Sequence, residues 1–335
     1  MESPLTENLA VVGAGSWGTA LAIALAPRFG SVRLWARRPE QAQAIHETRE
    51  NALYLAGFPL AENVSVTSKL EEAVLGAQVV ILVVPSRFVR GQVAALSGLL
   101  DEDAVILSAT KGLENGTLFR MSQVIRDVLA RPVRLAVLSG PTFAREVAAG
   151  EPVAVVVASD DIEIARRLQP RLSGSAFRVY ASDDVIGVET GAALKNVIAI
   201  ASGICQGLGL GSNTVAALVT RGLAEITRLA VALGGRERTL AGLAGLGDLV
   251  LTTTGDLSRN RSVGLRLGRG ESLDAILAST SMVAEGVVTC KAAHDLARKL
   301  EVPAPIILEV FSILYENKNP RTALQHLMDR PLTRE

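Results

Sequence analysis

Short apolar runs alternate with longer amphipathic stretches through the first half of the chain. The runs are rich in β-branched residues, as strands are, and the stretches between them have helical periodicity. The predicted strands are Leu9–Val12, Val32–Ala36, Val64–Thr67, Val79–Val84, Ala104–Ser108, Arg134–Leu138, Ala154–Ser159 and Phe177–Tyr180. This alternation is typical of βαβ units around a parallel sheet, and a run such as 79–84, apolar on both faces, predicts that helices cover both faces of the sheet.

The pattern changes near Asp183, where strand-like runs become scarce. Stretches rich in Ala, Leu and Gly with helical periodicity then continue to about residue 330, and the tail from Asn317 predicts a final helix. We therefore predict an α/β protein with two domains. A doubly wound, mostly parallel sheet occupies 1–185, and an all-α domain occupies 186–335.

Composition and charge narrow the function. The chain has 335 residues, of which 49% are hydrophobic, so two domains with sizeable cores are expected. Lys+Arg and Asp+Glu both total 34, so no net field attracts the chain to nucleic acid or an acidic membrane, and a bound anion needs a local cluster. Cys205 and Cys290 form no CxxC pair, and only three histidines occur. We expect no disulfide, no metal site and a cytoplasmic location.

An uncharged segment near the N-terminus, Leu9 to Ala26, raises the question of export or a membrane helix. No positively charged residue precedes Arg28, although a signal peptide requires one. Three glycines within six residues are better explained by a tight turn between two short elements. We therefore predict no integral membrane segment.

The same glycines carry the first functional motif. Gly13, Gly15 and Gly18, with Ser16 and Trp17 among them, follow the first predicted strand and precede a run of helix formers. This is a GxGxxG in the context that a dinucleotide pyrophosphate requires, because the turn and the helix N-terminus present backbone N–H groups to the anion. An ordinary glycine-rich turn is the alternative. We predict a Rossmann-type cofactor domain.

The end of the second strand separates the two nicotinamide cofactors. An acidic residue there binds the ribose 2′-hydroxyl of NAD, whereas an arginine accommodates the 2′-phosphate of NADP. The chain has Arg37 and Arg38 at this place and no acid. We favour NADPH as the cofactor, with NADH as the alternative. The two arginines could instead be a solvated surface pair with no role in binding.

Later segments complete a longer pattern. They are Ser-Gly-Pro-Thr-Phe-Ala at 139–144, Leu-Lys-Asn-Val at 194–197, Gly-Leu-Ala-Gly-Leu-Gly-Asp-Leu at 242–249, Ser-Arg-Asn-Arg at 258–261 and Met-Val-Ala-Glu-Gly at 282–286. With the glycine motif, and in this order, they resemble the bacterial NAD(P)-dependent glycerol-3-phosphate dehydrogenases. The resemblance implies reversible reduction of dihydroxyacetone phosphate to sn-glycerol 3-phosphate, which supplies phospholipid biosynthesis, and it leaves a homodimer open.

Lys195 is the candidate proton donor and acceptor. Carbonyl reduction requires such a group, and this lysine interrupts an apolar helical stretch, 190–201. A free lysine has a pKa of about 10.4, so burial or a neighbouring cation such as Lys111 would have to lower it. A lysine that snorkels from a helix edge is the structural alternative. The resemblance makes Asp248, in a glycine-rich turn, a carboxylate that binds the substrate hydroxyl and orients the lysine; a helix cap is its alternative.

A phosphorylated substrate requires donors and positive charge together. Ser258, Arg259 and Asn260, followed by a helix-like run from Arg261 to Leu267, offer both. The full set of predicted substrate contacts is Lys111, Gly140, Thr142, Lys195, Asp248, Ser258, Arg259 and Asn260. The predicted cofactor contacts are Gly13, Gly15, Ser16, Trp17, Gly18, Arg37, Arg38, Tyr54, Lys111, Ala144, Arg259, Val283 and Glu285.

Two other functions remain open. A related NADP-dependent hydroxyacid dehydrogenase, of the 6-phosphogluconate or ketopantoate reductase kind, would have a carboxylate site in place of the phosphate cluster. A non-catalytic NADP-binding redox sensor would keep the glycine turn and could lose the lysine. The presence of Lys195, Asp248 and Arg259 together favours catalysis.

Overall fold

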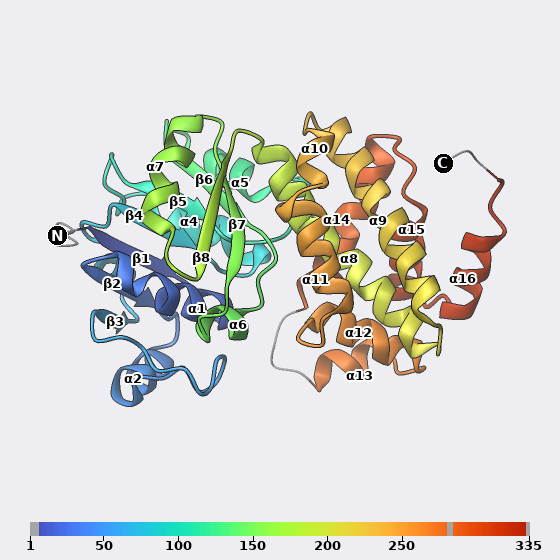
Figure 1. Cartoon of the computed structure of the whole chain (residues 1–335), viewed down its shortest axis with the longest axis horizontal. Helices are drawn as coiled ribbons and strands as arrows, with labels where there is room; N and C mark the ends of the chain where they lie inside the picture. The colour runs from blue at the N-terminus through green and yellow to red at the C-terminus, as the bar shows by residue number, and fades with distance from the viewer. Residues whose placement is uncertain (1–6, 280–283, 333–335) are drawn as a thin grey trace. The chain divides into compact units, whose positions relative to one another are not determined.

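The chain folds into two compact units. The structure is a computed structural model that describes residues 7–279 and 284–332. The first unit comprises residues up to 111 and residues 121–185, and the second comprises 112–120 and the residues from 186 onward. The short segment 112–120 therefore belongs with the helical half of the chain. Figure 1 labels the helices and strands of both units.

The first unit contains an eight-stranded sheet in the order β3-β2-β1-β4-β5-β6-β7-β8. Its strands are β1 (Asn8–Val12), β2 (Ser31–Trp35), β3 (Val64–Thr67), β4 (Val79–Leu82), β5 (Val105–Ser108), β6 (Arg134–Ser139), β7 (Val153–Ala158) and β8 (Phe177–Ser182). All neighbours are parallel except β6 and β7. The predicted fold class is confirmed, and every predicted strand is present with ends that differ by no more than two residues.

Helices cover both faces of this sheet. They are α1 (Ser16–Leu25), α2 (Pro39–Thr48), α3 (Leu70–Val74), α4 (Val89–Leu96), α5 (Met121–Leu129), α6 (Ala144–Ala148) and α7 (Ile162–Leu172). Leu9, Val11 and Ile81 on one face pack in a single apolar cluster with α1 and α7. The alternate residues Ala10 and Val80 on the other face are equally buried. Because both faces are covered, the strands are apolar throughout, as predicted from the run at 79–84.

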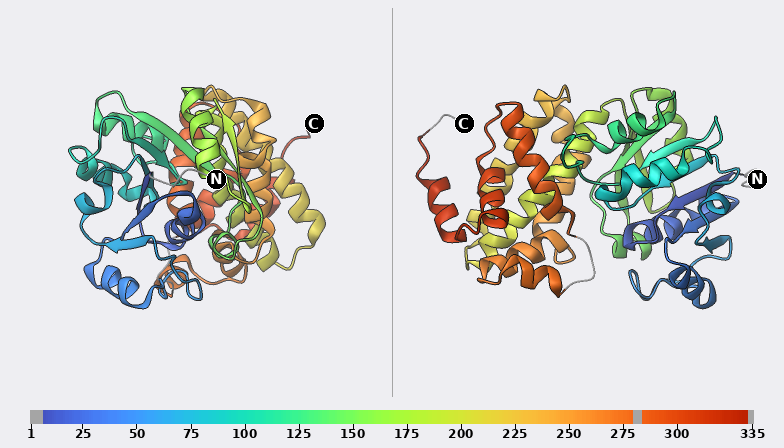
Figure 2. Two further views of the ribbon diagram at one scale, coloured as in Figure 1. Left: turned by 60° about the vertical axis from the view of Figure 1, so that its left-hand side comes forward. Right: turned by 180° about the vertical axis from the view of Figure 1, so that it is seen from behind.

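From residue 186 onward, the described part of the second unit is built of helices, drawn from yellow-green to red in Figures 1 and 2. They are α8 (Val185–Gly207), α9 (Ser212–Ala232), α10 (Glu237–Leu240), α11 (Asp248–Thr254), α12 (Arg259–Gly268), α13 (Leu273–Ala278), α14 (Glu285–Lys299), α15 (Pro305–Tyr315) and α16 (Pro320–Met328). α8 is long and apolar enough to span a membrane, but 94% of its most apolar window is buried within the protein. It is therefore the core helix of this unit.

α8 and α12 are in unusually close contact. A Cβ atom added at Gly203 of α8 would lie 2.0 Å from the carbonyl oxygen of Arg261, and one added at Gly264 of α12 would lie 1.9 Å from that of Ile200. Only glycine lets the two backbones approach so closely at these positions. This contact places the C-terminal half of α8 beside the first two turns of α12, the helix that begins at the candidate substrate residues.

Candidate active site

The glycine turn joins β1 to α1 at the point where the strand order reverses. Gly13 has a φ of 127°, and a Cβ atom at this position would lie 2.7 Å from the carbonyl oxygen of Val83. A Cβ atom at Gly18 would lie 1.8 Å from the Gly13 oxygen, whereas one at Gly15 would meet nothing within 4 Å. The first and third glycines thus pack the turn, and the second faces open space, as expected where a ligand approaches the backbone.

The start of α1 has the features of an anion site. Gly15 is the N-cap residue and provides no side-chain cap, and Ser16 and Trp17 form the first turn. The indole Nε1 of Trp17 is buried and has no hydrogen-bond partner in the described part of the chain. A helix N-terminus with unsatisfied N–H groups, beside a turn that only glycine can form, fits the pyrophosphate of a dinucleotide.

The two arginines after β2 are both exposed. The guanidinium of Arg37 lies 5.5 Å from the centre of the Phe88 ring, and Nη2 of Arg38 donates to the hydroxyl of Tyr54 at 3.4 Å. Arg38 is also the N-cap residue of α2. Tyr54, a predicted cofactor residue, is therefore brought next to Arg38.

Three further predicted residues, Lys111, Gly140 and Thr142, meet at the carboxyl edge of the same sheet. Nζ of Lys111, after β5, donates to the carbonyl oxygen of Gly140, after β6, at 3.1 Å. The hydroxyl of Thr142 donates to the same oxygen at 3.1 Å. Gly140 has a φ of 150°, and a Cβ atom there would lie 2.9 Å from the Cα of Val155. Ala144 begins α6 directly after this cluster.

Lys195 is the centre of a buried polar group in the second unit. Its Nζ donates to Oδ1 of Asp248 at 2.5 Å and to the hydroxyl of Thr252 at 2.6 Å. The side chains of Lys195 and Asp248 are 7% and 0% exposed. The Thr252 hydroxyl donates its own proton to the backbone oxygen of Asp248 at 2.7 Å, so it accepts from the ammonium. The lysine is an ion-paired core residue and does not snorkel from a helix edge.

Asp248 lies in a different local structure from the one expected. A π-helical turn, Leu243–Gly247, precedes it, and Asp248 is the first residue of α11 instead of a residue of a loose glycine-rich turn. Its carboxylate accepts a hydrogen bond from the Lys195 ammonium. Thr252 lies one turn further along α11 and therefore on the same face.

The predicted phosphate cluster forms the start of α12. This helix begins at Arg259, two residues before the predicted Arg261, because the hydroxyl of Ser258 caps it by accepting from the Arg261 N–H at 3.3 Å. Arg259 is exposed, yet the protein atoms around it lower the pKa of its guanidinium, while the carboxylate of Glu285 counteracts this shift. The Arg259 guanidinium and the capped N-terminus of α12 thus lie together, and both attract an anion.

Asn260 links three helices. Its Nδ2 donates to Oδ1 of Asn196 on α8 at 2.9 Å, and its Oδ1 accepts from the Gly286 N–H at the start of α14 at 2.9 Å. Glu285 is the residue before Gly286, so the same contact brings it toward Arg259. Val283, another predicted cofactor residue, lies outside the described residues.

Comparison with known proteins identifies the family. A family model described as the N-terminus of NAD-dependent glycerol-3-phosphate dehydrogenase matches residues 8–165, and one described as its C-terminus matches residues 184–325. The chain belongs to this dehydrogenase family. It is 52% identical over 330 residues to the glycerol-3-phosphate dehydrogenase [NAD(P)+] of Syntrophotalea carbinolica, covering 98% of this chain and 99% of that one.

Solved structures agree with this membership. The crystal structure of glycerol-3-phosphate dehydrogenase from Coxiella burnetii superposes with a TM-score of 0.93 and 41% identity, over 98% of this chain and 100% of that one. A ketopantoate reductase from Ralstonia eutropha superposes with a TM-score of only 0.62 and 21% identity, over 95% and 99% of the two chains. The second likeness shows a shared fold alone.

Four residues of this family member were missed by the sequence interpretation. Thr252 and Asn196 contact predicted site residues, as described above, and Gln41 and Asn51 both donate to the glycine turn at Ala14. The spacing of Thr252 from Asp248, one helical turn, was a usable signal. The contacts from Gln41 and Asn51 span 27 and 37 residues and leave no local pattern.

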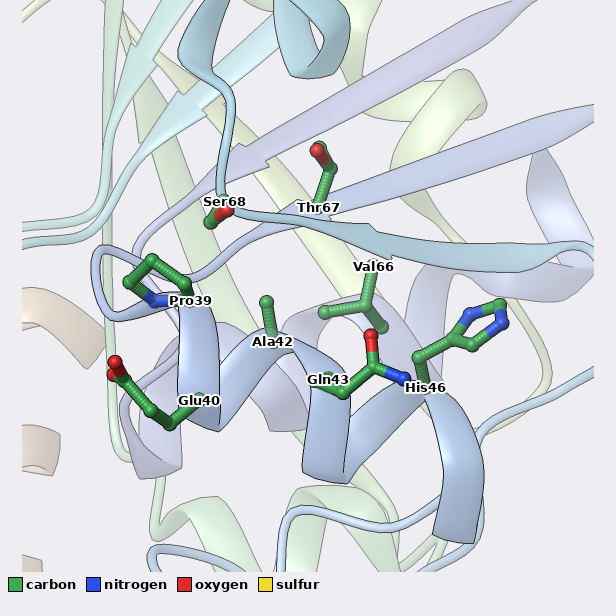
Figure 3. A pocket seen from close by; sticks show the side chains of 8 residues that line it. All are labelled: Pro39, Glu40, Ala42, Gln43, His46, Val66, Thr67 and Ser68. Carbon is green, nitrogen blue, oxygen red and sulfur yellow. The ribbon is translucent and has the colours of Figure 1, made fainter.

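A surface pocket lies between α2 and the end of β3 (Figure 3). It is lined by Pro39, Glu40, Ala42, Gln43, His46, Val66, Thr67 and Ser68. None of these is a predicted site residue of the dehydrogenase, and we assign it no ligand. Among the described residues, no group of three or more His, Cys, Asp or Glu side chains is arranged to hold a metal ion.

Proposed function

We propose that this protein reduces dihydroxyacetone phosphate to sn-glycerol 3-phosphate with NAD(P)H, and catalyses the reverse reaction, with Lys195 as proton donor and acceptor. The observation that carries the proposal is the buried contact of the Lys195 ammonium with Asp248 and Thr252. A buried lysine with a dedicated carboxylate, on the helix that forms the core of the unit, is a costly arrangement that packing alone does not require.

The chemistry divides between the cofactor and the side chains. When bound, NAD(P)H supplies the hydride that adds to the substrate carbonyl carbon. The carbonyl oxygen then requires a proton, which the ammonium of Lys195 donates in our proposal; in reverse, its amine accepts the hydroxyl proton. Asp248 and Thr252 orient the ammonium of Lys195. The Asp248 carboxylate attracts it as the opposite charge, and the Thr252 hydroxyl oxygen accepts one of its hydrogen bonds.

The substrate phosphate is assigned to the start of α12. The Arg259 guanidinium, the Ser258 hydroxyl and the N–H groups of the first turn are the donors there. Asn260 keeps one amide hydrogen beyond its contact with Asn196, which we assign to the substrate. Gly140, Thr142 and Lys111, grouped in the first unit, are proposed as the remaining substrate contacts.

We assign the cofactor to the glycine turn and prefer NADPH. Arg37 and Arg38 are exposed beyond the end of β2, where an acid would select NADH. Replacing both arginines with glutamine should weaken NADPH by about 10-fold more than NADH, since bidentate phosphate contacts are lost. Fluorescence titration with each cofactor measures this, and an equal loss for both would place the 2′-phosphate elsewhere.

The biological setting follows from the product. sn-Glycerol 3-phosphate is the backbone of glycerophospholipids, so we propose that the enzyme supplies their synthesis in the cytoplasm. Cys205 and Cys290 are free and buried, as a reducing compartment allows. The homodimer stays a prediction, which sedimentation analysis would test.

The test of the proposed function is a substrate comparison. NADPH consumption should be rapid with dihydroxyacetone phosphate and at background level with ketopantoate and other 2-keto acids. Turnover of a keto acid in preference to the triose phosphate would favour the hydroxyacid dehydrogenase alternative. Cofactor binding without turnover of any of these would favour the redox sensor.

A further inference from the structure

The carbonyl oxygen of Ala14, inside the glycine turn, accepts two side-chain amides at once. Nε2 of Gln41 donates to it at 2.9 Å, and Nδ2 of Asn51 donates at 3.0 Å. Gln41 lies on α2 and Asn51 follows the end of that helix. A carbonyl oxygen has two lone pairs, so these two donors saturate it.

Asn51 is held by more than this contact. Its Nδ2 also donates to the hydroxyl of Thr19 on α1 at 2.8 Å, so both amide hydrogens are used. The residue is 1% exposed, and its Oδ1 is buried without a hydrogen-bond partner in the described part of the chain. A buried oxygen without a partner is unfavourable. The Asn51 amide is therefore kept in this place for the two hydrogen bonds that its Nδ2 donates.

The geometry of one peptide links this contact to the cofactor. In a trans peptide the C=O and the N–H point in opposite directions. When the Ala14 carbonyl is directed at Gln41 and Asn51, the N–H of Gly15 is directed the opposite way, on the side where the Gly15 Cα faces open space. That N–H belongs to the turn assigned to the pyrophosphate.

We propose that Gln41 and Asn51, here called the amide pair, are positioning residues that orient the Ala14–Gly15 peptide so that its N–H is pre-set to bind the cofactor pyrophosphate. Without the pair, the peptide can rotate its carbonyl toward the phosphate and repel it. This inference rests on the proposed function in one respect, namely that the glycine turn binds NAD(P).

The test is the dissociation constant of NADPH, measured by fluorescence without substrate, together with kcat at saturating NADPH. Asn51→Asp keeps the shape but replaces the donor with an acceptor that faces the Ala14 oxygen. We expect it to weaken NADPH about 10- to 100-fold while kcat changes by less than about 2-fold. Gln41→Ala should weaken NADPH only about 3-fold, because Asn51 still occupies the carbonyl, and the double variant should lose more than the product of the two.

Asn63→Asp is the matched control. Nδ2 of Asn63 donates to the backbone oxygens of Ala26 and Phe29, each at 2.9 Å, beyond the other end of α1. It should alter thermal stability and leave the NADPH affinity unchanged. If Asn51→Asp binds NADPH as the wild type does, or if Asn63→Asp weakens it equally, the amide pair does not position the turn.

The outcomes separate this inference from the proposed function. A wild type that binds NADPH but does not reduce dihydroxyacetone phosphate would overturn the function and leave the amide pair to be judged by the binding data. A wild type that binds neither nicotinamide cofactor would overturn both. If Asn51→Asp does not fold, Gln41→Glu places the same acceptor at the less buried side of the carbonyl. Because Gln41 also contacts Arg38, the variant is measured with NADH, which has no 2′-phosphate, and should bind it at least about 5-fold more weakly; no change would overturn the inference.

Discussion

The two units bury different kinds of polar group. In the described part of the first unit, the buried polar residues are serines, one threonine and one asparagine, with Asp184 at its very end. The described part of the second unit buries Glu189, Lys195, Glu225 and Asp248. Apart from Asp184, the described part of the first unit thus buries no charged residue, whereas the second unit holds four charged side chains in its core. Substitutions in the two units should therefore change different measured properties, namely kcat and folding stability in the second unit and NADPH affinity in the first.

The largest effect is expected in the second unit. Asp248→Asn removes the carboxylate from a buried ammonium, so kcat should fall at least about 10²-fold and the free energy of unfolding by about 3 kcal/mol or more. Steady-state kinetics and urea unfolding measure the two. Asp256→Asn is the control, since this 94% exposed aspartate pairs with Arg261 at 2.9 Å and should contribute little. Equal effects of the two variants would remove the distinction between buried and exposed pairs.

The next largest effect is a pH dependence of the folding stability, which we expect from a buried carboxyl group of the second unit. The Glu225 carboxylate accepts from the N–H groups of Ile306 and Ile307 at the start of α15, and burial raises its pKa from 4.5 to about 7 although those N–H groups, Arg228 and Arg330 lower it. A raised acid pKa means that the folded state binds the proton more tightly. This contribution is complete below about pH 4.5 and is lost as pH rises through about 7, up to roughly 3 kcal/mol.

Glu225→Gln should therefore abolish a fall in stability between about pH 5 and about pH 8 that the wild type shows. Urea unfolding followed by circular dichroism at several pH values measures the slope. Glu102→Gln, at an exposed position of the first unit, should leave it unchanged. A wild-type stability that rises across this range would contradict the assignment to Glu225.

A smaller effect is expected from the glycine turn. Gly13→Ala places a Cβ atom 2.7 Å from the Val83 oxygen at a φ of 127°, so the turn must shift. NADPH should bind about 10-fold more weakly, and stability should fall by about 1 to 3 kcal/mol. Gly98→Ala, where a Cβ atom meets open space, is the control. Undiminished NADPH affinity in the Gly13 variant would mean that the turn is not the cofactor site.

Local patterns predicted the first unit better than the second. The eight strands follow from short apolar runs, and the turn at Gly13 follows from spacing alone, since both depend on neighbours in sequence. The start of α12 was placed two residues late because the Ser258 cap is a side-chain effect that periodicity does not register. The contacts of Thr252 with Lys195 and of Asn51 with Ala14 join residues 57 and 37 positions apart, and only the tertiary fold specifies them.

We propose that cofactor binding and proton transfer depend on different residues, the glycine turn with its neighbouring arginines in one unit and Lys195 in the other. The most direct measurement compares NADPH affinity with kcat in Lys195→Ala, beside Lys291→Ala as an exposed control on α14. For Lys195→Ala we expect an NADPH dissociation constant within about 2-fold of the wild type and a kcat lower by about 10² to 10⁴. A Lys195→Ala enzyme with near-native kcat, or one that has lost NADPH binding, would contradict it.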